Sequence, residues 1–186
     1  MAGIDDRSLY RRNVEAYLAS RGGEESVRAR LAGERAVLDA ESVPPALRDF
    51  DARVRRYHEG VTGLGAHLRF LEKLTGARPM ARIFLKALDM EAALDVPAVE
   101  RERETFLRHL AARIMPEQAV RLLADAAALR AGNLSAPEFY RRFSKAAERA
   151  GVSLDKTPAF RRYVDYVLLS DRLDATRLFV ETADME

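Results

Sequence analysis

Residues 47–75 read LRDFDARVRRYHEGVTGLGAHLRFLEKLT, and apolar side chains recur in this stretch at alternating steps of three and four residues. That spacing is the a/d pattern of a coiled-coil seam, and it is sustained here for about four heptads. A single helix from Pro45 to Thr75 would be about 46 Å long at about 1.5 Å per residue. The pattern therefore predicts a helical protein organised around this seam. Its members are Leu47, Phe50, Val54, Tyr57, Val61, Leu64, Leu68, Leu71 and Thr75.

Three glycines interrupt the seam, at Gly60, Gly63 and Gly65. Each glycine in an exposed helix interior costs about 1 kcal/mol relative to alanine. We therefore favour two helices, over about 45–59 and 62–75, with the chain bent at Gly60. The alternative is one continuous helix in which Gly60 and Gly65 allow a neighbouring backbone to approach closely.

Caps and stops predict further helices along the whole chain, with no strand pattern, no hairpin dipeptide and no repeat at a period of 20–50 residues. Asp5 or Asp6 can cap the first helix, Gly22-Gly23 can end it, and Ser42-Val-Pro-Pro marks a boundary. Ser135 to Glu138 form a capping box, while the last residues, 181–186, are expected to fray. The expected helices cover about 6–21, 24–40, 79–94, 96–114, 116–131, 136–150, 158–170 and 175–180.

We expect an all-α fold, an elongated antiparallel helical bundle with a coiled-coil-like hairpin and a compact C-terminal helical subdomain. The expected parts are an N-terminal helical hairpin over 1–44, a central core over 45–131 and the subdomain over 132–186, although one continuous domain is also compatible with the pattern. Residues 116–131 are apolar nearly all round, so we expect this helix to be the most enclosed one.

Composition narrows the class of protein. Charged residues make up 32% of the chain and nearly balance, 31 basic against 29 acidic, which is typical of a solvated helical surface. The chain has no cysteine, which excludes disulfides and thiolate chemistry. It shows no signal peptide and no transmembrane segment, so we expect a cytoplasmic protein, and its arginine and alanine content is typical of a high-GC bacterial genome.

Signatures of catalysis are missing. His58, His67 and His109 are the only histidines, and none of them has the spacing of a metal-binding pair. We find no nucleophile elbow and no phosphate-binding loop, and the carboxylates of residues 89–104 read as ordinary surface charge. We therefore predict no metal and no cofactor, and we favour a non-catalytic role while leaving catalysis open.

Charge is distributed unevenly along the chain. Residues 51–86 hold eight basic against three acidic side chains, and residues 87–104 hold six acidic against two basic ones. Complementary pairing between neighbouring helices is the simpler explanation. The alternative is a basic face for nucleic acid or acidic lipid. Its residues would be Arg53, Arg55, Arg56, Arg69, Arg78 and Arg82.

The function that we expect is a non-catalytic protein–protein interaction or scaffold domain, with either another protein or a second copy of this chain as the partner. A homodimer would use the exposed end of the seam, at Leu47, Phe50, Val54 and Tyr57. The first three of these side chains would forfeit about 1.5–3 kcal/mol each if they stayed in water. Cover by the N-terminal helices, over about 10–17 and 27–38 of the same chain, is the slightly less favoured alternative. Nucleic-acid binding is the less favoured alternative. A small-molecule binder or enzyme, with an interhelical pocket lined by tyrosine and histidine, is a third. The aromatic residues of the C-terminal third are expected to form a core between the last three helices.

Overall fold

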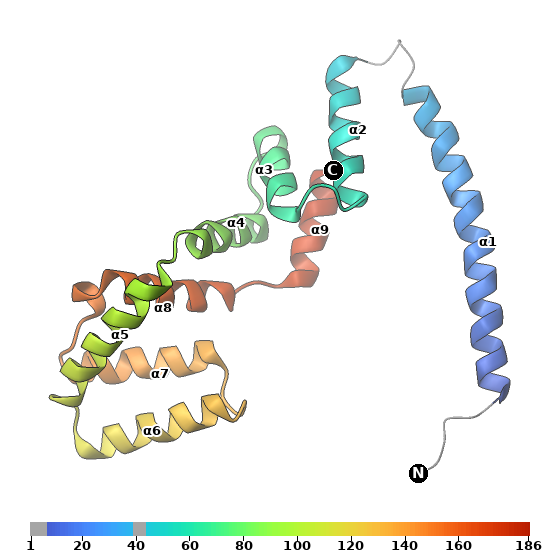
Figure 1. Cartoon of the computed structure of the whole chain (residues 1–186). Coiled ribbons are helices and arrows are strands. Elements are labelled where there is room, and N and C mark those ends of the chain that lie inside the picture. Colours follow the sequence, from blue (N-terminus) through green and yellow to red (C-terminus); the bar gives the residue numbers. More distant parts are fainter. Residues whose placement is uncertain (1–6, 39–43) are drawn as a thin grey trace. The chain divides into compact units, whose positions relative to one another are not determined.

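The protein is all-helical, as the sequence predicts (Figure 1). The computed structural model describes residues 7–38 and 44–186, and within them it contains no strand. A short 3-10 helix, η1 (Leu154–Lys156), interrupts the loop before α8. The α-helices are α1 (Arg7–Leu38), α2 (Pro45–His58), α3 (Leu64–Thr75), α4 (Pro79–Ala92), α5 (Val96–Ala111), α6 (Pro116–Arg130), α7 (Ala136–Arg149), α8 (Pro158–Ser170) and α9 (Ala175–Met185).

Contacts divide the chain into two compact units, residues 1–61 and residues 62–186. This division does not test the domain boundaries predicted after residues 44 and 131. Among the described residues, the helix contacts do not confirm the predicted antiparallel bundle or the coiled-coil-like hairpin, although α3 and α4 do contact one another.

The first unit begins with one long helix where the sequence predicts two. α1 continues through Gly22-Gly23, so the predicted stop there is wrong. Glycine can adopt helical dihedrals at a cost of about 1 kcal/mol, so a glycine pair weakens a helix without ending it when strong helix formers lie on both sides. The predicted cap at Asp5 or Asp6 and the boundary at Ser42 lie outside the described residues.

The seam breaks where the glycines predict. α2 ends at His58, and Gly60 has a φ of 73°, a left-handed conformation that favours glycine. The backbone N–H of Val61 donates to the carbonyl of Arg56, and that of Gly60 donates to Tyr57. These two bonds form a Schellman motif, which ends a helix by satisfying its last carbonyls. The prediction of a break at Gly60 is confirmed.

An aromatic core joins α5, α7 and α8 in the second unit. Phe106 is only 1% exposed, and its ring centroid lies 5.5 Å from that of Phe143 and 5.6 Å from that of Phe160. Tyr140 packs edge-on against the same group. The C-terminal aromatics therefore do form a core, but α5 supplies the third helix in place of α9, where Phe179 is exposed.

A second buried region lies where α9 packs on α3 and α4. Leu68 and Leu71 of α3 are fully buried, and Met185 at the end of α9 is almost fully buried. The prediction that residues 181–186 fray is wrong, because α9 extends to Met185. The apolar contacts of its last turn hold it in place.

The expectation that residues 116–131 form the most enclosed helix is also wrong. Among the residues of α6, none is buried. α6 lies along the edge of the second unit, and α7 is the element that it packs against extensively (Figure 1). An apolar surface all round a helix indicates burial only where enough neighbouring helices are present to cover it.

The pair α4–α5 recurs as the pair α8–α9, 79 residues later in the chain. Each pair begins with proline at the first helical position, and its second helix begins after an aspartate that caps it. The two proline helices, α4 and α8, pack against each other. This spacing is longer than the 20–50 residues of common helical repeats. Identical residues occupy Pro79 and Pro158, Arg82 and Arg161, Leu94 and Leu173, Asp95 and Asp174, and Glu102 and Glu181.

Candidate functional site

Two glutamates of the second unit, Glu181 (buried) and Glu102 (half-buried), accept hydrogen bonds from backbone N–H groups at the starts of helices. The backbone N–H groups of Met80 and Ala81 donate to Oε2 of Glu181, at 2.7 and 3.2 Å. These two N–H groups belong to the first turn of α4, where Pro79 has none to donate and the residue before it supplies no side-chain cap. Glu181, on α9, thus caps α4 from a distant part of the sequence.

Glu102 has the same role at the other proline helix. The N–H groups of Ala159 and Phe160 donate to its Oε2, at 2.6 and 3.1 Å. The hydroxyl of Thr157, at the start of α8, donates instead to the carbonyl of Leu154, so it does not cap α8. The expectation that Glu102 is ordinary surface charge is therefore wrong. Both carboxylates stabilise helix termini, which accounts for their position without any catalytic role.

A third polar contact is buried between α3 and the C-terminus. The imidazole of His67 is 1% exposed, and its Nε2 lies 2.6 Å from Oε1 of Glu186. His58 and His109 are exposed. Among the described residues, no group of three or more His, Asp or Glu side chains could hold a metal ion. Nor does any described helix have the length and apolar character needed to cross a bilayer.

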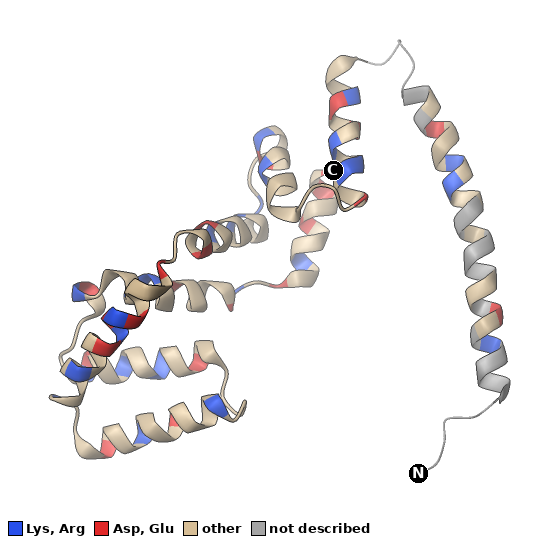
Figure 2. Ribbon diagram, in the orientation of Figure 1, with Lys and Arg blue, Asp and Glu red and all other residues tan. Residues whose placement is uncertain are grey.

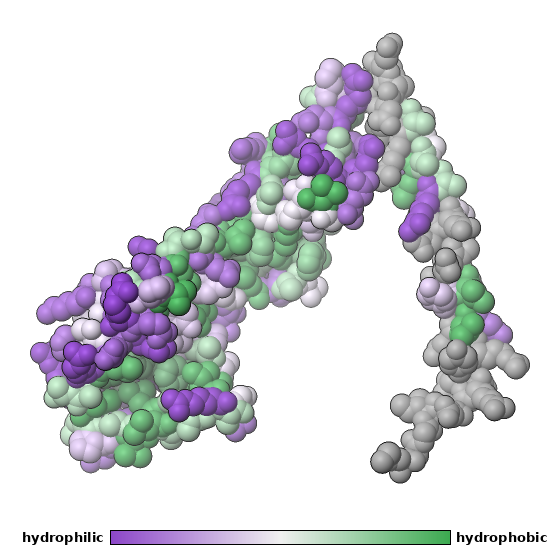
Figure 3. Space-filling view, viewed as in Figure 1, coloured by the Kyte–Doolittle hydropathy of each residue, from purple (hydrophilic) through white to green (hydrophobic). Residues whose placement is uncertain are grey.

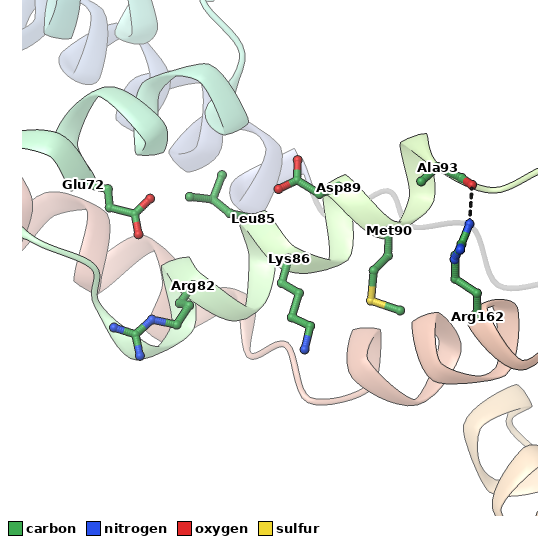
Figure 4. Close-up of a pocket in the computed structure, with 8 residues that line it drawn as sticks. All are labelled: Glu72, Arg82, Leu85, Lys86, Asp89, Met90, Ala93 and Arg162. Carbon is green, nitrogen blue, oxygen red and sulfur yellow. Dashed lines mark hydrogen bonds between the residues drawn. The ribbon is translucent and has the colours of Figure 1, made fainter. Parts of the chain in front are cut away.

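The groove drawn in Figure 4 lies between α4 and its neighbours α3 and α8, and has a volume of about 520 Å³. Arg162 donates to the carbonyl of Ala93 at 3.4 Å and so stabilises the end of α4. Arg82 and Lys86 extend to one side of the helix, away from Glu72 and Asp89 (Figure 4). The lining contains no serine, threonine, tyrosine or histidine, and the predicted pocket of tyrosine and histidine does not correspond to this groove.

The uncovered face of α6 is the feature that the sequence-based prediction missed. Val120 is 66% exposed and Leu123 is 71% exposed, and Ala124 and Ala127 lie beside them on the same side of the helix. These residues follow the steps of three and four that place side chains on one face. In Figure 3 hydrophobic surface gathers over α6, at the lower left. Met115, just before the helix, is also exposed. We refer to Val120, Leu123, Ala124 and Ala127 as the α6 stripe.

The predicted dimer residues lie together on α2. Leu47 is 48% exposed, whereas Phe50, Val54 and Tyr57 are half-buried, and α2 has no buried residue. Their spacing places all four on one side of the helix. The prediction that they contact a partner stays a prediction.

The predicted basic face divides between the two units, and half of its charge is engaged in ion pairs. Figure 2 shows basic and acidic residues interspersed along the helices, as on α5. Among the six arginines, Arg69 bonds to an acidic residue of the next helix, which is the complementary pairing that the charge distribution predicts. The three pairs are Arg53 with Asp49, Arg55 with Asp51, and Arg69 with Asp89.

No protein family, curated protein or solved structure matches this chain. Its function has to be inferred from the arrangement of its own residues.

Proposed function

We propose that this chain is a non-catalytic helical domain for protein–protein interaction, with the α6 stripe as one binding surface. The observation that carries the proposal is the exposure of Val120 and Leu123, side by side on a helix that only α7 covers extensively. Single exposed apolar residues are normal on a protein surface, but a continuous stripe on one helix face marks an interaction site.

The energetic argument follows from side-chain size. Burying a valine or leucine side chain contributes about 1.5–3 kcal/mol relative to leaving it in water. The small side chains of Ala124 and Ala127 beside them let another helix approach closely. A partner helix lying along α6 is therefore the arrangement that this surface fits.

The a/d stripe of α2 is a second candidate surface. Leu47, Phe50, Val54 and Tyr57 have the spacing of a coiled-coil face, and none of them is buried. The homodimer expected through this end of the seam remains part of the proposal. A nucleic-acid partner is less favoured, because Arg53, Arg55 and Arg69 already form ion pairs with carboxylates of this chain.

Site-specific photo-crosslinking tests the α6 surface. Leu123 would be replaced by benzoylphenylalanine in the full-length chain, in the cells that naturally produce it, and irradiated. We expect discrete protein adducts that disappear when Val120→Asp is added. Val96, an apolar residue at the start of α5 that is 62% exposed, is the matched control position. If position 123 yields no more adduct than position 96, the α6 stripe is not a binding surface.

A further inference from the structure

A groove runs between α6 and α7, next to the α6 stripe, and has a volume of about 430 Å³. Ala124 belongs both to the stripe and to the groove lining. Leu122 and Ala146 add apolar surface. The basic residues of the lining are Arg121, Arg142, Lys145 and Arg149, and Asp125 is its acidic one.

Existing ion pairs neutralise one of these four cations. Arg142 bonds to Asp125 at 2.8 Å and also to Glu138. These two carboxylates raise the pKa of the Arg142 guanidinium above its ordinary value, with Glu138 the larger influence. Within the described residues, no ion pair involves Arg121, Lys145 or Arg149. The groove therefore carries an uncompensated positive charge.

We propose that this groove binds an acidic segment of a partner protein, in an inference that rests on the proposed function of the α6 stripe. Carboxylates of the segment pair with Arg121, Lys145 and Arg149, and its apolar side chains lie on Leu122 and Ala124. Lys145 and Arg149 are one helical turn apart on α7, so they fit carboxylates that are similarly spaced on a partner helix.

Charge and apolar surface together favour a protein segment over a nucleic acid. A phosphate backbone needs cations, but it gains nothing from the leucine and alanines of the lining or from the stripe beside them. An amphipathic helix with acidic flanks uses both features at once, in the manner of helix-in-groove recognition. Charge complementarity also steers encounter and selects among partners.

The test uses the full-length chain and a fluorescently labelled helical peptide with leucine on one face and glutamate along the flanks. A twin peptide with lysine at every glutamate position and a single-stranded oligonucleotide serve as competing probes. Fluorescence anisotropy gives the three affinities. We expect the acidic peptide to bind and the lysine twin not to bind. The double variant Lys145→Glu with Arg149→Glu should lower the affinity for the acidic peptide at least tenfold.

Arg82→Glu with Lys86→Glu is the matched control. These two residues are also a basic pair one turn apart with exposed side chains, and they line the other groove. We expect this variant to bind the peptide like the wild type. Lys145→Gln with Arg149→Gln, which only neutralises the charge, replaces the reversed variant if circular dichroism shows that the latter is misfolded.

Several results would overturn the inference. They are unchanged peptide affinity in both groove variants, equal binding of the lysine twin, or tighter binding of the oligonucleotide. A homodimer that dissociates on Lys145→Glu with Arg149→Glu would assign the groove to a second copy instead of a separate partner. If the peptide fails to bind while crosslinks at position 123 persist, the acidic partner is excluded and the protein-binding role of the α6 stripe stands.

Discussion

Glu102 and Glu181 occupy corresponding positions, 79 residues apart, in the two helix pairs α4–α5 and α8–α9. Each of them caps the first helix of the other pair. Glu102, on α5, caps α8, while Glu181, on α9, caps α4. Because α4 and α8 also pack against each other, the two caps fix a reciprocal arrangement around that pair. In neither pair does the second helix supply a cap for the first N–H groups of its own proline helix.

Replacing Glu181 by alanine should lower the free energy of unfolding by about 2 kcal/mol. The change removes the acceptor from two N–H groups at a buried helix start, and a lost cap typically costs about 1 kcal/mol while an unsatisfied buried donor costs about 1–3 kcal/mol. Glu181→Gln keeps a neutral acceptor and should cost less. Denaturant titration followed by circular dichroism measures both variants.

Glu148→Ala is the control for this experiment, because Glu148 is exposed on α7. It should change stability by no more than about 0.5 kcal/mol. The loss of unfolding free energy for Glu102→Ala should lie between those of Glu181→Ala and Glu148→Ala, since Glu102 is only half-buried. If Glu181→Ala and Glu148→Ala have equal stabilities, the caps do not stabilise the fold.

Gly65→Ala should destabilise the protein by about 1 kcal/mol. A Cβ atom added at this position would lie 2.5 Å from Cδ2 of Leu88, which must move aside. The close neighbour is thus a side chain of α4 and not a backbone, as the less favoured alternative of a continuous helix would have required. Leu88→Ala makes room, so the double variant should show a favourable coupling of about 1 kcal/mol in a double-mutant cycle. Additive effects would show that the two positions do not meet.

We expect the folded protein to lose stability in alkaline solution because of Tyr140. Burial, reinforced by the neighbouring Tyr163, raises the pKa of the Tyr140 hydroxyl well above its ordinary value of about 10. In the unfolded chain the hydroxyl ionises above about pH 10, whereas in the folded protein it stays protonated. The folded state therefore binds more protons there, and its stability falls as pH rises, by up to about 1.4 kcal/mol per pH unit.

Tyr140→Phe isolates this contribution. The difference in unfolding free energy between wild type and variant should be constant below about pH 10 and should fall above it. Denaturant titrations across this pH range give the difference directly. A difference that does not change with pH would mean that Tyr140 ionises alike in both states.

Phe50→Asp together with Val54→Asp tests the predicted homodimer contact on α2. If these half-buried side chains meet a second copy, two charges there should convert a dimer into a monomer, because burying an unpaired carboxylate costs several kcal/mol. Sedimentation equilibrium at several concentrations gives the mass. A wild-type chain that is monomeric throughout, or a dimer that survives both substitutions, rules out this contact.

The sequence alone predicted the features that depend on neighbouring residues. The all-α class, the break at Gly60 and the serine cap at Ser135 follow from backbone propensities and short-range hydrogen bonds, which are encoded within a few residues. Of the predicted capping box only this half forms, because the Glu138 carboxylate bonds to Arg142 instead of returning a bond to Ser135. The signal at Gly22-Gly23 was misleading, because glycine weakens a helix but does not require it to end.

Tertiary structure decided everything that depends on which helix lies next to which. Glu102 and Glu181 look like surface carboxylates, and only the positions of α8 and α4 make them caps. A proline helix start without its own cap does not reveal such a remote cap, because α2 and α6 begin in the same way and no distant carboxylate caps them among the described residues. The apolar α6 could have been buried or exposed, because hydrophobic burial depends on the neighbours that the fold supplies and not on the helix itself. The sequence determined where the helices form, and long-range packing determined which of their faces remain available for a partner.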